Sequence, residues 1–446
     1  MASIEAFNDW LQQRNSGQSE FIQAATDIAR DVIPIINVHD DYKRHQVLHR
    51  LAEPDRIVSF KVVWEDDSGE VRVNRGWRVQ QSNLLGPYKG GLRFHPRLNE
   101  SVLKFLAFEQ CFKNALTGLS LGGGKGGSDF DPRGRSDREI MRFCQSFMRQ
   151  LQRHIGPHTD VPAGDINVGA REIGYLYGEY RRLANEFSGS ITGKDTGFGG
   201  SPVREEATGF GVVYFTQYAL AERGESLEGK RVLISGAGNV ALHAAAKAYD
   251  EGAKVLSLSN SKGALYVEGG MTRSHLNRLR ELNDSDNALE ALSDAPDAEW
   301  LPEKTPWHIP CDIAMPCATQ NELDATDAKS LIESGCAWLV EGANMPLTDD
   351  ASTFVRGAET LTYIPGKASN AGGVAVSGLE MRQNAQFHQL SFEELDKQLR
   401  QLMQHIHQAW VADGEHQREN GSTDYSRGAN VAGFRRLADA LVAQGF

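Results

Sequence analysis

The feature that most constrains the fold is a glycine-containing turn between a strand pattern and a helix pattern in the second half of the chain. A short apolar run at 231–235 leads into Gly236-Ala237-Gly238-Asn239-Val240-Ala241. A helical pattern to residue 249 and a second apolar run at 254–259 follow. Two parallel strands joined through a helix over about thirty residues form a βαβ unit. The spacing therefore predicts a doubly wound α/β domain.

The same turn predicts a dinucleotide-binding site. Gly236 permits a tight turn, Gly238 lets the backbone approach a pyrophosphate, and Ala241 is small enough for the helix to pack on the sheet. The N–H groups at the start of the helix, including those of Asn239 and Val240, can then bind the phosphates. Two glycines at this spacing also occur in ordinary strand–turn–helix corners, but the position between a strand and a helix favours a dinucleotide.

The end of the second strand favours NADP over NAD. An NAD site usually carries Asp or Glu about 20 residues after the glycines, to bind the ribose 2′-hydroxyl. Here the strand ends in Ser257-Leu258-Ser259-Asn260-Ser261-Lys262, with no carboxylate. Ser259 and Lys262 can hydrogen-bond and neutralise a 2′-phosphate that an acid would repel. The alternative is that Lys262 is a solvated surface lysine.

The remaining periodicity predicts further elements on both sides of this unit. We expect helices in residues 1–55, interrupted near Pro34, then strands in 56–94 and a helix over 99–117. The glycine-rich segment 188–211 is interpreted as a hinge between domains. The other expected elements are a helical stretch at 271–300, strands at 312–315 and 337–341, and a helix at 212–222.

Charge and cysteine content exclude several functions. The net charge of −12 without a basic block argues against nucleic-acid or membrane-surface binding. No run of about 18 apolar residues and no N-terminal targeting pattern occurs, so we expect a soluble cytoplasmic protein. The five cysteines form neither a CxxC pair nor an array at zinc spacing. Reduced buried thiols and no metal site are therefore expected.

Three lysines in the first half of the chain have unusual neighbours. Lys89 follows Gly86-Pro87-Tyr88 and precedes two glycines, and Lys125 has three glycines before it and two after. Lys113 lies on the helix expected at 99–117, three residues after Gln110, so these two share one face. A lone lysine is usually a surface residue. The segment 122–127 also lacks the spacing of a P-loop. If the lysines converge, burial and mutual repulsion would lower the pKa of one amine and suit it to act as a base or nucleophile.

Asp165 is a candidate proton carrier beside these lysines. It stands in the short segment Val161-Pro162-Ala163-Gly164-Asp165. A carboxylate in such a setting can transfer protons. Taken alone, it fits an Asx-turn or a helix N-cap better than a catalytic role.

Taken together, these segments resemble a known family, the hexameric glutamate dehydrogenases, with the NADP-linked bacterial and fungal branch most similar. The resemblance covers nearly the whole chain. The matching segments are, in order, 87–96 (PYKGGLRFHP), 110–114 (QCFKN), 122–129 (GGGKGGSD), 162–169 (PAGDINVG), 207–211 (ATGFG), 236–241 (GAGNVA), 315–322 (MPCATQNE), 341–346 (EGANMP) and 370–377 (NAGGVAVS).

The resemblance implies a role for individual residues. Lys125 is implied as the catalytic lysine and Asp165 as its acid/base partner. Lys89 and Ser377 are implied to bind the side-chain carboxylate of glutamate. The α-carboxylate is assigned to Lys113, Gln110 and the backbone at Gly164; the cofactor is assigned to Thr208, Gly236, Gly238, Asn239, Val240, Ser259, Lys262 and Asn344.

The resemblance also implies the architecture and the reaction. It implies two α/β domains: a substrate-binding and oligomerisation domain with a mixed sheet over 1–200, and a doubly wound dinucleotide domain over 201–419. A returning C-terminal helix at about 420–446 is implied to join the first domain, and the two domains to close over the substrate. The implied enzyme is a homohexamer that interconverts L-glutamate with 2-oxoglutarate and ammonium, with hydride transfer to NADP and a role in ammonium assimilation.

Three other functions fit parts of the sequence less well. Leucine-, valine- and phenylalanine-type dehydrogenases share the lysine, the aspartate and the dinucleotide domain, but Lys89 would leave a buried cation unpaired beside an apolar side chain. A non-catalytic dinucleotide-binding regulator would have lost a catalytic group, whereas Lys125 and Asp165 are both present. A phosphate-transfer enzyme does not fit the spacing of the glycine-rich lysine segment.

Overall fold

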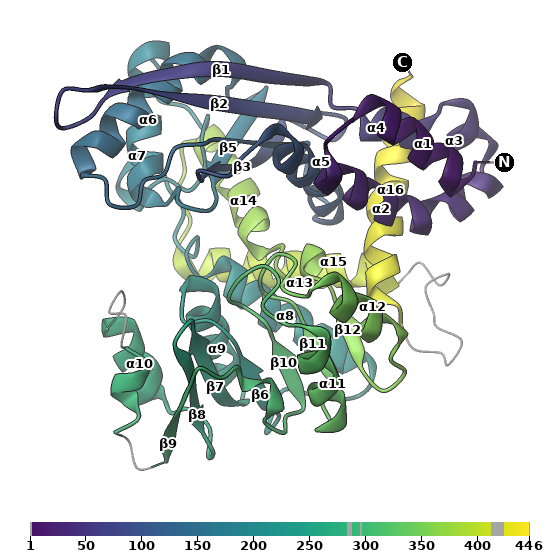
Figure 1. Cartoon of the computed structure of the whole chain (residues 1–446), viewed down its shortest axis with the longest axis vertical. Helices are drawn as coiled ribbons and strands as arrows, with labels where there is room; N and C mark the ends of the chain where they lie inside the picture. Colours follow the sequence, from purple (N-terminus) through teal and green to yellow (C-terminus); the bar gives the residue numbers. More distant parts are fainter. Residues whose placement is uncertain (1, 283–287, 295–296, 412–422, 446) are drawn as a thin grey trace. The chain divides into compact units, whose positions relative to one another are not determined.

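The computed structural model describes residues 2–282, 288–294, 297–411 and 423–445. The chain divides into two compact units (Figure 1). The first comprises Met1–Arg204, Val374–Leu395 and Asn430–Phe446, and the second comprises Glu205–Gly373 and Asp396–Ala429. This division differs from the expected domain boundaries at Val374–Leu395, which belongs to the first unit rather than to the dinucleotide domain. Residues 420–422 of the expected C-terminal helix lie outside the described residues.

The elements of the first unit alternate between helices and strands. They are α1 (Ile4–Arg14), α2 (Ser19–Val38), α3 (Asp40–Arg44), α4 (Val47–Ala52), β1 (Arg56–Glu65), β2 (Val71–Ser82), β3 (Tyr88–Phe94), α5 (Glu100–Leu116), β4 (Gly123–Ser128), α6 (Asp137–Leu151), η1 (Gln152–His154), β5 (Asp160–Gly164), α7 (Ala170–Ala184) and η2 (Thr196–Phe198).

The second unit follows a strand–helix alternation. Its elements are α8 (Ala207–Glu222), β6 (Arg231–Ile234), α9 (Asn239–Asp250), β7 (Lys254–Asn260), β8 (Gly263–Val267), α10 (Arg273–Glu281), η3 (Glu290–Leu292), β9 (Ala298–Pro302), η4 (Pro306–His308), β10 (Ile313–Met315), α11 (Ala325–Glu333), β11 (Trp338–Val340), α12 (Asp349–Gly357), β12 (Thr362–Ile364) and α13 (Gly366–Ser369). Residues of both units occur in α14 (Gly372–Gln386), α15 (Phe392–Val411) and α16 (Tyr425–Gln444).

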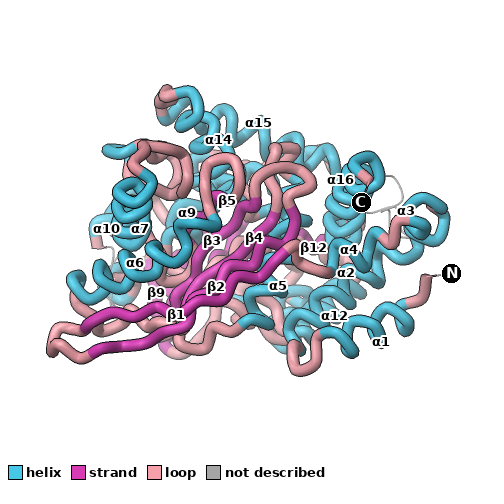
Figure 2. Tube along the Cα trace, turned by 90° about the horizontal axis from the view of Figure 1, so that it is seen from above, coloured by secondary structure: helices cyan, strands magenta, loops and turns pink. Residues whose placement is uncertain are grey.

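The first unit is built on a mixed five-stranded sheet of order β1-β2-β4-β3-β5, whose strands lie side by side in Figure 2. β2 pairs antiparallel with β1 and β4, whereas β3 pairs parallel with β4 and β5. Val62, Trp64 and Phe94 pack with the buried side chains of α6 and α7. Trp77 and Val79 pack against α5 instead, so helices cover both faces of the sheet.

The second unit has a seven-stranded sheet of order β12-β11-β10-β6-β7-β8-β9. The strands from β12 to β7 are parallel, whereas β8 pairs antiparallel with both β7 and the edge strand β9. The chain runs from β6 outward to β7 and later returns to β10 on the other side of β6, which places a topological switch point between β6 and β10. This is the doubly wound arrangement, in which ligands bind beyond the carboxyl ends of the strands at the switch point. The predicted fold class is confirmed.

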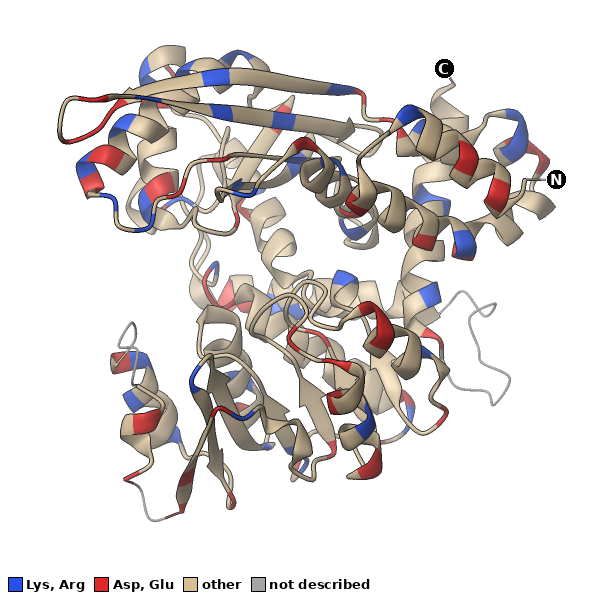
Figure 3. Ribbon diagram, in the orientation of Figure 1, with Lys and Arg blue, Asp and Glu red and all other residues tan. Residues whose placement is uncertain are grey.

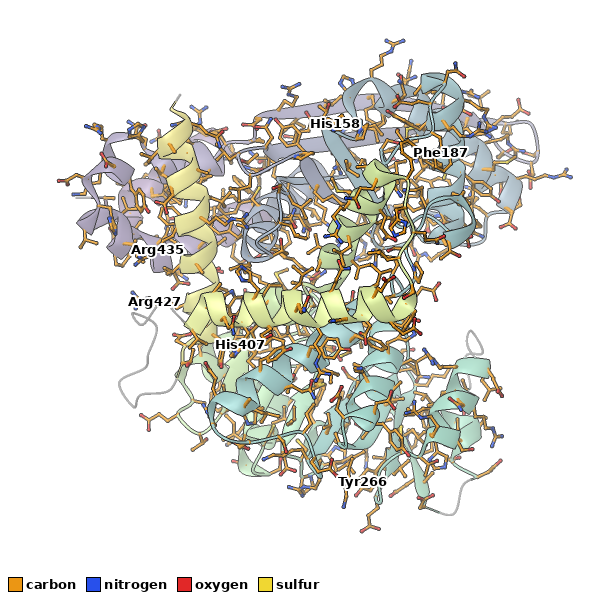
Figure 4. The ribbon with its side chains drawn as sticks, turned by 180° about the vertical axis from the view of Figure 1, so that it is seen from behind. His158, Phe187, Tyr266, His407, Arg427 and Arg435 are labelled. Atoms are coloured by element: carbon orange, nitrogen blue, oxygen red, sulfur yellow. The ribbon has the colours of Figure 1, made fainter. Side chains whose placement is uncertain are left out.

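Helix α15 packs on α8 within the second unit. His407 of α15, labelled in Figure 4, is buried, and its ring makes an edge contact with Phe215 at 5.2 Å between ring centroids. The Tyr425 hydroxyl at the start of α16 donates a hydrogen bond to Glu222 on α8. Burial lowers the pKa of His407 to about 4, so its ring is neutral at physiological pH.

Two expectations about secondary structure were wrong. Helix α2 continues through Pro34 to Val38, because Ile33, Ile35 and Ile36 are buried in a core with α1 and α5 and packing outweighs the missing N–H of the proline. The helix expected at 271–300 ends at Glu281, and Ala298–Pro302 forms a strand paired with β8. Residues 283–287 and 295–296 of that expected helix lie outside the described residues.

Charged residues of both signs are interspersed over the elements of each unit, as Figure 3 shows. In the part of the chain that the structure describes, no helix is both long enough and apolar enough to span a bilayer.

Candidate active site

Lys125 lies on a buried strand at the centre of the first sheet. Strand β4 pairs with β2 on one side and β3 on the other, and all its residues are buried. A Cβ atom on Gly123 would stand 2.1 Å from the Sγ atom of Cys111 on α5, and one on Gly126 would stand 2.7 Å from a carbonyl oxygen of β2. The missing side chains of these glycines therefore allow α5 and β2 to pack directly against β4. No secondary structure was predicted for this segment, and the structure shows that it is a strand.

Asp165 lies next to Lys125 because β5 ends one residue before it. The Lys125 Nζ atom is 2.9 Å from the Asp165 Oδ2 atom, and the two side chains are only 9% and 14% exposed. Arg93, on β3, donates from Nε to the same oxygen at 3.2 Å. A Cβ on Gly91 would stand 2.8 Å from the Cβ of Asp165, so this glycine allows β3 to lie against the carboxylate. The structure thus brings together the two residues predicted to be catalytic.

Burial and charge shift the pKa of both partners. Burial lowers the pKa of Lys125, while Asp165 partly restores it and Arg93 lowers it further. Burial alone would raise the pKa of Asp165, but the charges of Lys125 and Arg93 outweigh it and lower this pKa to about 2. The site therefore holds a carboxylate that is ionised at neutral pH beside an amine that releases its proton more readily than a solvated lysine.

Lys89, on β3, is almost completely buried, with 1% of its surface exposed. Its Nζ atom donates a hydrogen bond to the Thr192 Oγ1 atom at 2.8 Å. Burial, followed by the positive charge of Arg204, lowers the pKa of Lys89 well below its ordinary value; the carboxylates of Glu380 and Asp160 oppose this shift. A buried ammonium with a hydroxyl as its hydrogen-bond partner is suited to bind an anionic group.

Lys113 and Gln110 both lie on α5, as predicted. Burial and the charge of Lys125 lower the pKa of Lys113 to about 8. Gln110 donates from Nε2 to the Oδ1 atom of Asn114 at 2.7 Å, and Asn114 donates from Nδ2 to the backbone oxygen of Lys89 at 3.1 Å. Helix α5 is thereby attached to the strand that carries Lys89.

Ser377 is buried on α14 within the first unit. The next residue, Gly378, would place a Cβ 2.6 Å from the Cδ1 atom of Leu119 and 3.5 Å from that of Leu121. These leucines come just before β4. Gly164 is the last residue of β5, directly before Asp165. The predicted substrate residues Lys89, Gln110, Lys113, Gly164 and Ser377 thus all belong to the first unit.

A fully buried ion pair beneath the site was not predicted. Arg78 on β2 donates to both carboxylate oxygens of Asp160, at 2.5 and 2.9 Å, and neither side chain is exposed. Arg78 also donates to the backbone oxygen of Gly90 at 3.0 Å, and Gln80 donates to Asp160 at 2.8 Å. The partners lie 82 positions apart in the sequence, so no local pattern could have identified them. Thr192, Asn114 and Arg93 were missed for the same reason.

The glycine turn of the second unit has the geometry expected for a dinucleotide. Gly236 has a φ of 90°, which glycine adopts without strain, and its Cβ would stand 3.2 Å from that of Ala241. Gly238 precedes α9 as its N-cap, without a capping side chain, and a Cβ built on it would meet nothing within 4 Å. Open space beside the backbone at a helix N-terminus fits a pyrophosphate.

The turn lies at the switch point of the second sheet. The backbone N–H of Cys317, after β10, donates to the Ser235 Oγ atom after β6 at 2.9 Å. Glu322 accepts hydrogen bonds from the N–H groups of Ala318 and Thr319 and so holds the loop after β10. Burial raises the pKa of Glu322. The segment 315–322 therefore lies beside the glycine turn, at the carboxyl ends of β6 and β10.

The other predicted cofactor residues are distributed around this edge. Ser259 accepts a hydrogen bond at Oγ from the Gly236 N–H at 3.1 Å, so it supports the turn directly. Lys262 is exposed in the connection from β7 to β8. Asn239 and Asn344 are exposed, with Asn344 accepting a hydrogen bond from Asn370 at 3.0 Å, and Val240 is half-buried in the first turn of α9.

The boundary between the two units, after Arg204, falls inside the segment 188–211 that was interpreted as the hinge, but the end of that segment is helical and carries Thr208. Thr208 is half-buried in the first turn of α8, which begins at Ala207 rather than after Gly211. A Cβ on Gly209 would stand 2.5 Å from the Ala244 nitrogen of α9, and one on Gly211 would stand 3.0 Å from the Gly372 Cα. These glycines lie inside a helix because its neighbours approach closely.

Known proteins match the chain over nearly its whole length. Residues 199–445 match the model of the Glutamate/Leucine/Phenylalanine/Valine dehydrogenase family, and residues 54–182 match the Glu/Leu/Phe/Val dehydrogenase dimerisation domain. An NADP-specific glutamate dehydrogenase of Psychrobacter sp. is 52% identical over 99% of both chains. An NAD-specific glutamate dehydrogenase of Bacteroides fragilis is 48% identical over the same shares.

A solved structure agrees with these sequence matches. The crystal structure of Plasmodium falciparum glutamate dehydrogenase has a TM-score of 0.95 and is 46% identical, covering 99% of this chain and 94% of that one. Both units, with the buried lysines of the first and the glycine turn of the second, are therefore those of a known group of enzymes. The chain belongs to the glutamate/leucine/phenylalanine/valine dehydrogenase family.

Proposed function

We propose that this chain is an NADP-dependent glutamate dehydrogenase, which interconverts L-glutamate with 2-oxoglutarate and ammonium. The observation that carries the proposal is the group of buried cations in the first unit. Lys89 is buried beside Thr192, and Lys125 is paired with Asp165 on the same sheet. A substrate with two carboxylates and a reacting carbon between them matches two cationic binding positions and one proton-transfer pair. Full-length relatives named as glutamate dehydrogenases support this choice within the family.

The substrate is held at both ends. Lys89 and Ser377 bind the side-chain carboxylate, and Lys113, Gln110 and the backbone at Gly164 bind the α-carboxylate. The near-complete burial of Lys89 supports an anionic side chain, because an apolar one would leave the ammonium without compensation for its lost hydration. Two fixed ends also orient the α-carbon for reaction, which is where much of an enzyme's rate gain arises.

Lys125 and Asp165 carry out the proton transfers. Lys125 acts first as a neutral amine that assists the attack of water on the iminium carbon, and then as an ammonium that polarises the developing oxygen. Asp165 moves protons to and from the substrate nitrogen. Their 2.9 Å contact couples the titration of the two groups. When Lys125 loses its proton, Asp165 loses the positive charge that most lowers its pKa. Burial, which lowers the pKa of Lys125, favours the neutral amine that the first step needs.

The cofactor site belongs to the second unit. Gly236, Gly238, Asn239 and Val240 bind the pyrophosphate through the turn and the first N–H groups of α9. Ser259 and Lys262 would bind the 2′-phosphate and Thr208 the carboxamide, and Asn344 would contribute to the same site. A bound nicotinamide supplies the hydride acceptor or donor. The absence of a carboxylate at the end of β7 supports NADP, although a relative named NAD-specific is nearly as similar as one named NADP-specific.

Assembly, location and direction complete the proposal. The match to a dimerisation domain and the resemblance to hexameric enzymes support a homohexamer. All five cysteines are free and buried, which supports a reducing, cytoplasmic location. We assign the enzyme to ammonium assimilation, with 2-oxoglutarate and ammonium as the substrates. The mass in solution, from light scattering, tests the hexamer.

The function is tested by following NADPH absorbance with 2-oxoglutarate and ammonium. Consumption is expected with 2-oxoglutarate and much less with 4-methyl-2-oxopentanoate, which has an apolar side chain. Consumption with the branched acid alone would show a dehydrogenase for apolar amino acids. No consumption with any 2-oxo acid, together with NADPH binding, would show a non-catalytic regulator. The ratio of kcat/KM for NADPH and NADH in the same assay tests the cofactor.

A further inference from the structure

A second fully buried ion pair of the first unit lies outside the proposed catalytic machinery. Lys194, in the loop after β5 and α7, places its Nζ atom 2.8 Å from the Oε1 atom of Glu380 on α14. Neither side chain has any exposed surface. The partners are 186 positions apart, so the pair joins two distant segments of the chain.

Every group of this pair has several hydrogen-bond partners. Glu380 accepts from the backbone N–H groups of Gly193 and Lys194, at 2.9 and 3.4 Å. The Lys194 ammonium also donates to the Asn384 Oδ1 atom at 2.8 Å and to the Ile191 backbone oxygen. A buried ion pair is stable only when the polar atoms of both side chains have hydrogen-bond partners, as they do here. Removal of one partner would leave an uncompensated charge in the interior. The loop 191–194 is therefore held on α14 by charge as well as by backbone contacts.

The same loop carries the hydrogen-bond partner of Lys89. Thr192 accepts from the Lys89 ammonium at 2.8 Å, and its backbone N–H donates to the Pro162 oxygen of β5 at 3.0 Å. Glu380 lies three residues after Ser377 on α14, so the two side chains share one face of the helix. The ion pair thus connects the segment that orients Lys89 to the helix that carries Ser377.

We propose that Lys194 and Glu380 are positioning residues that hold Thr192 and Ser377 in register, and thereby fix where the Lys89 ammonium meets the side-chain carboxylate of the substrate. The inference rests on the proposed function, because it concerns that substrate's second carboxylate. Glu380 also opposes the effect of burial and of Arg204 on the pKa of Lys89, which helps to keep the ammonium charged. The pair therefore affects how strongly the enzyme prefers a dicarboxylate to a monocarboxylate substrate. It does not change the positions of Lys125 and Asp165.

The variants Glu380→Gln and Lys194→Met with Glu380→Gln test this role. The first keeps the size of the side chain and removes its charge; the double variant removes both charges together and leaves no buried ion unpaired. Asp66→Asn is the matched control, because Asp66 is a buried carboxylate that accepts from the N–H groups of Ser68 and Glu70 and pairs with Arg72 in the β1–β2 turn. All proteins are first compared with the unaltered chain by circular dichroism and thermal unfolding.

The readouts are KM values and inhibition constants measured with the full chain. For both variants we expect KM for 2-oxoglutarate to rise about tenfold, the effect of one misaligned charged hydrogen bond. KM for ammonium and NADPH should change less than about twofold. Inhibition by glutarate should weaken in parallel, whereas inhibition by pentanoate, which lacks the second carboxylate, should not. The control should lose stability without any of these changes.

Three outcomes would overturn the inference without contradicting the proposed function. If kcat falls while KM for 2-oxoglutarate is unchanged, or if glutarate and pentanoate weaken equally, the pair is only structural. If Glu380→Gln does not fold, while the double variant folds and keeps the KM values and inhibition constants of the Asp66→Asn control, the pair likewise has no positioning role. An unaltered chain that does not consume NADPH with 2-oxoglutarate would overturn the proposed function and this inference together.

Discussion

Glycine has opposite uses in the two units. On β4 of the first unit, glycines make room for the protein itself: a Cβ on Gly123 would stand 2.1 Å from Cys111. At the turn of the second unit, Gly238 leaves open space, since a Cβ there would meet nothing within 4 Å. Clustered glycine in a sequence therefore does not by itself indicate a ligand. In the first unit it brings a helix and three strands close enough to bury a lysine, and in the second it exposes backbone N–H groups.

The largest effect should come from Lys125→Ala in the first unit. Removal of a proton-transfer group typically lowers turnover by about a thousandfold, and we expect kcat to fall at least that far. NADPH affinity should be unchanged, because the turn that binds it lies in the other unit. Stopped-flow turnover and NADPH fluorescence titration measure the two quantities. Lys61→Ala, at an exposed position of β1, is the control. If Lys125→Ala lost NADPH binding, Lys125 would belong to the cofactor site and its assignment as the catalytic lysine would be wrong.

The glycine comparison can be tested directly with two alanine substitutions. Gly123→Ala should lower the free energy of unfolding by about 3 kcal/mol, the cost of overpacking a site that cannot expand. Gly238→Ala should leave it unchanged or raise it by about 0.5 kcal/mol, because alanine reduces the freedom of the unfolded chain and meets no atom in the folded one.

The same pair separates stability from cofactor affinity. Gly238→Ala should weaken NADPH binding about tenfold, since the methyl group occupies the space beside the pyrophosphate. Gly357→Ala, at the end of α12 where a Cβ also meets nothing within 4 Å, should have the same small effect on stability as Gly238→Ala and should leave NADPH affinity unchanged. Denaturant unfolding and fluorescence titration measure both. Equal stability losses in Gly123→Ala and Gly238→Ala would contradict the contrast between the units.

A smaller effect should appear in the pH dependence of substrate binding. Burial and the charge of Lys125 lower the pKa of Lys113 to about 8. In the proposed function the positive charge of Lys113 binds the α-carboxylate, so its loss at raised pH should increase KM for 2-oxoglutarate about tenfold per pH unit above that value. Lys113→Arg should flatten this part of the profile, because a guanidinium stays charged. An unchanged profile in the arginine variant would mean that another group, such as Lys89, controls it.

The second unit was more predictable from sequence than the first, for a physical reason. The turn after β6, the helix α9 and the strand β7 are consecutive, so local spacing predicted the fold of this unit and indicated the proposed dinucleotide site. In the first unit the decisive contacts join residues such as Arg78 and Asp160, or Lys194 and Glu380, which only the folded chain brings together. The strand β4 escaped prediction because glycine has little preference for strands, and its pairing with β2 and β3 and its packing against α5 arise only in the folded chain.

The resemblance to a family compensated for this difficulty but only in part. It named Lys89, Lys113, Lys125, Asp165 and Ser377 by their motifs, and the structure places all five in one unit. It did not name Thr192, which binds Lys89, or Arg93, which shares Asp165 with Lys125. Supporting residues of this kind follow from contacts, since their own sequence surroundings carry no distinctive spacing.

The smallest effect should come from the exposed end of the cofactor site. Lys262→Ala should raise KM for NADPH only about threefold, because an exposed charge pair contributes little in water. The effect should shrink at high salt, which screens such pairs, and KM for NADH should not change. Ser259→Ala should affect both cofactors, because Ser259 accepts from the Gly236 N–H and so supports the turn that binds either pyrophosphate. If Lys262→Ala weakened NADH and NADPH equally, Lys262 would act on the turn rather than on the 2′-phosphate. Specificity for NADP would then depend on the missing carboxylate alone.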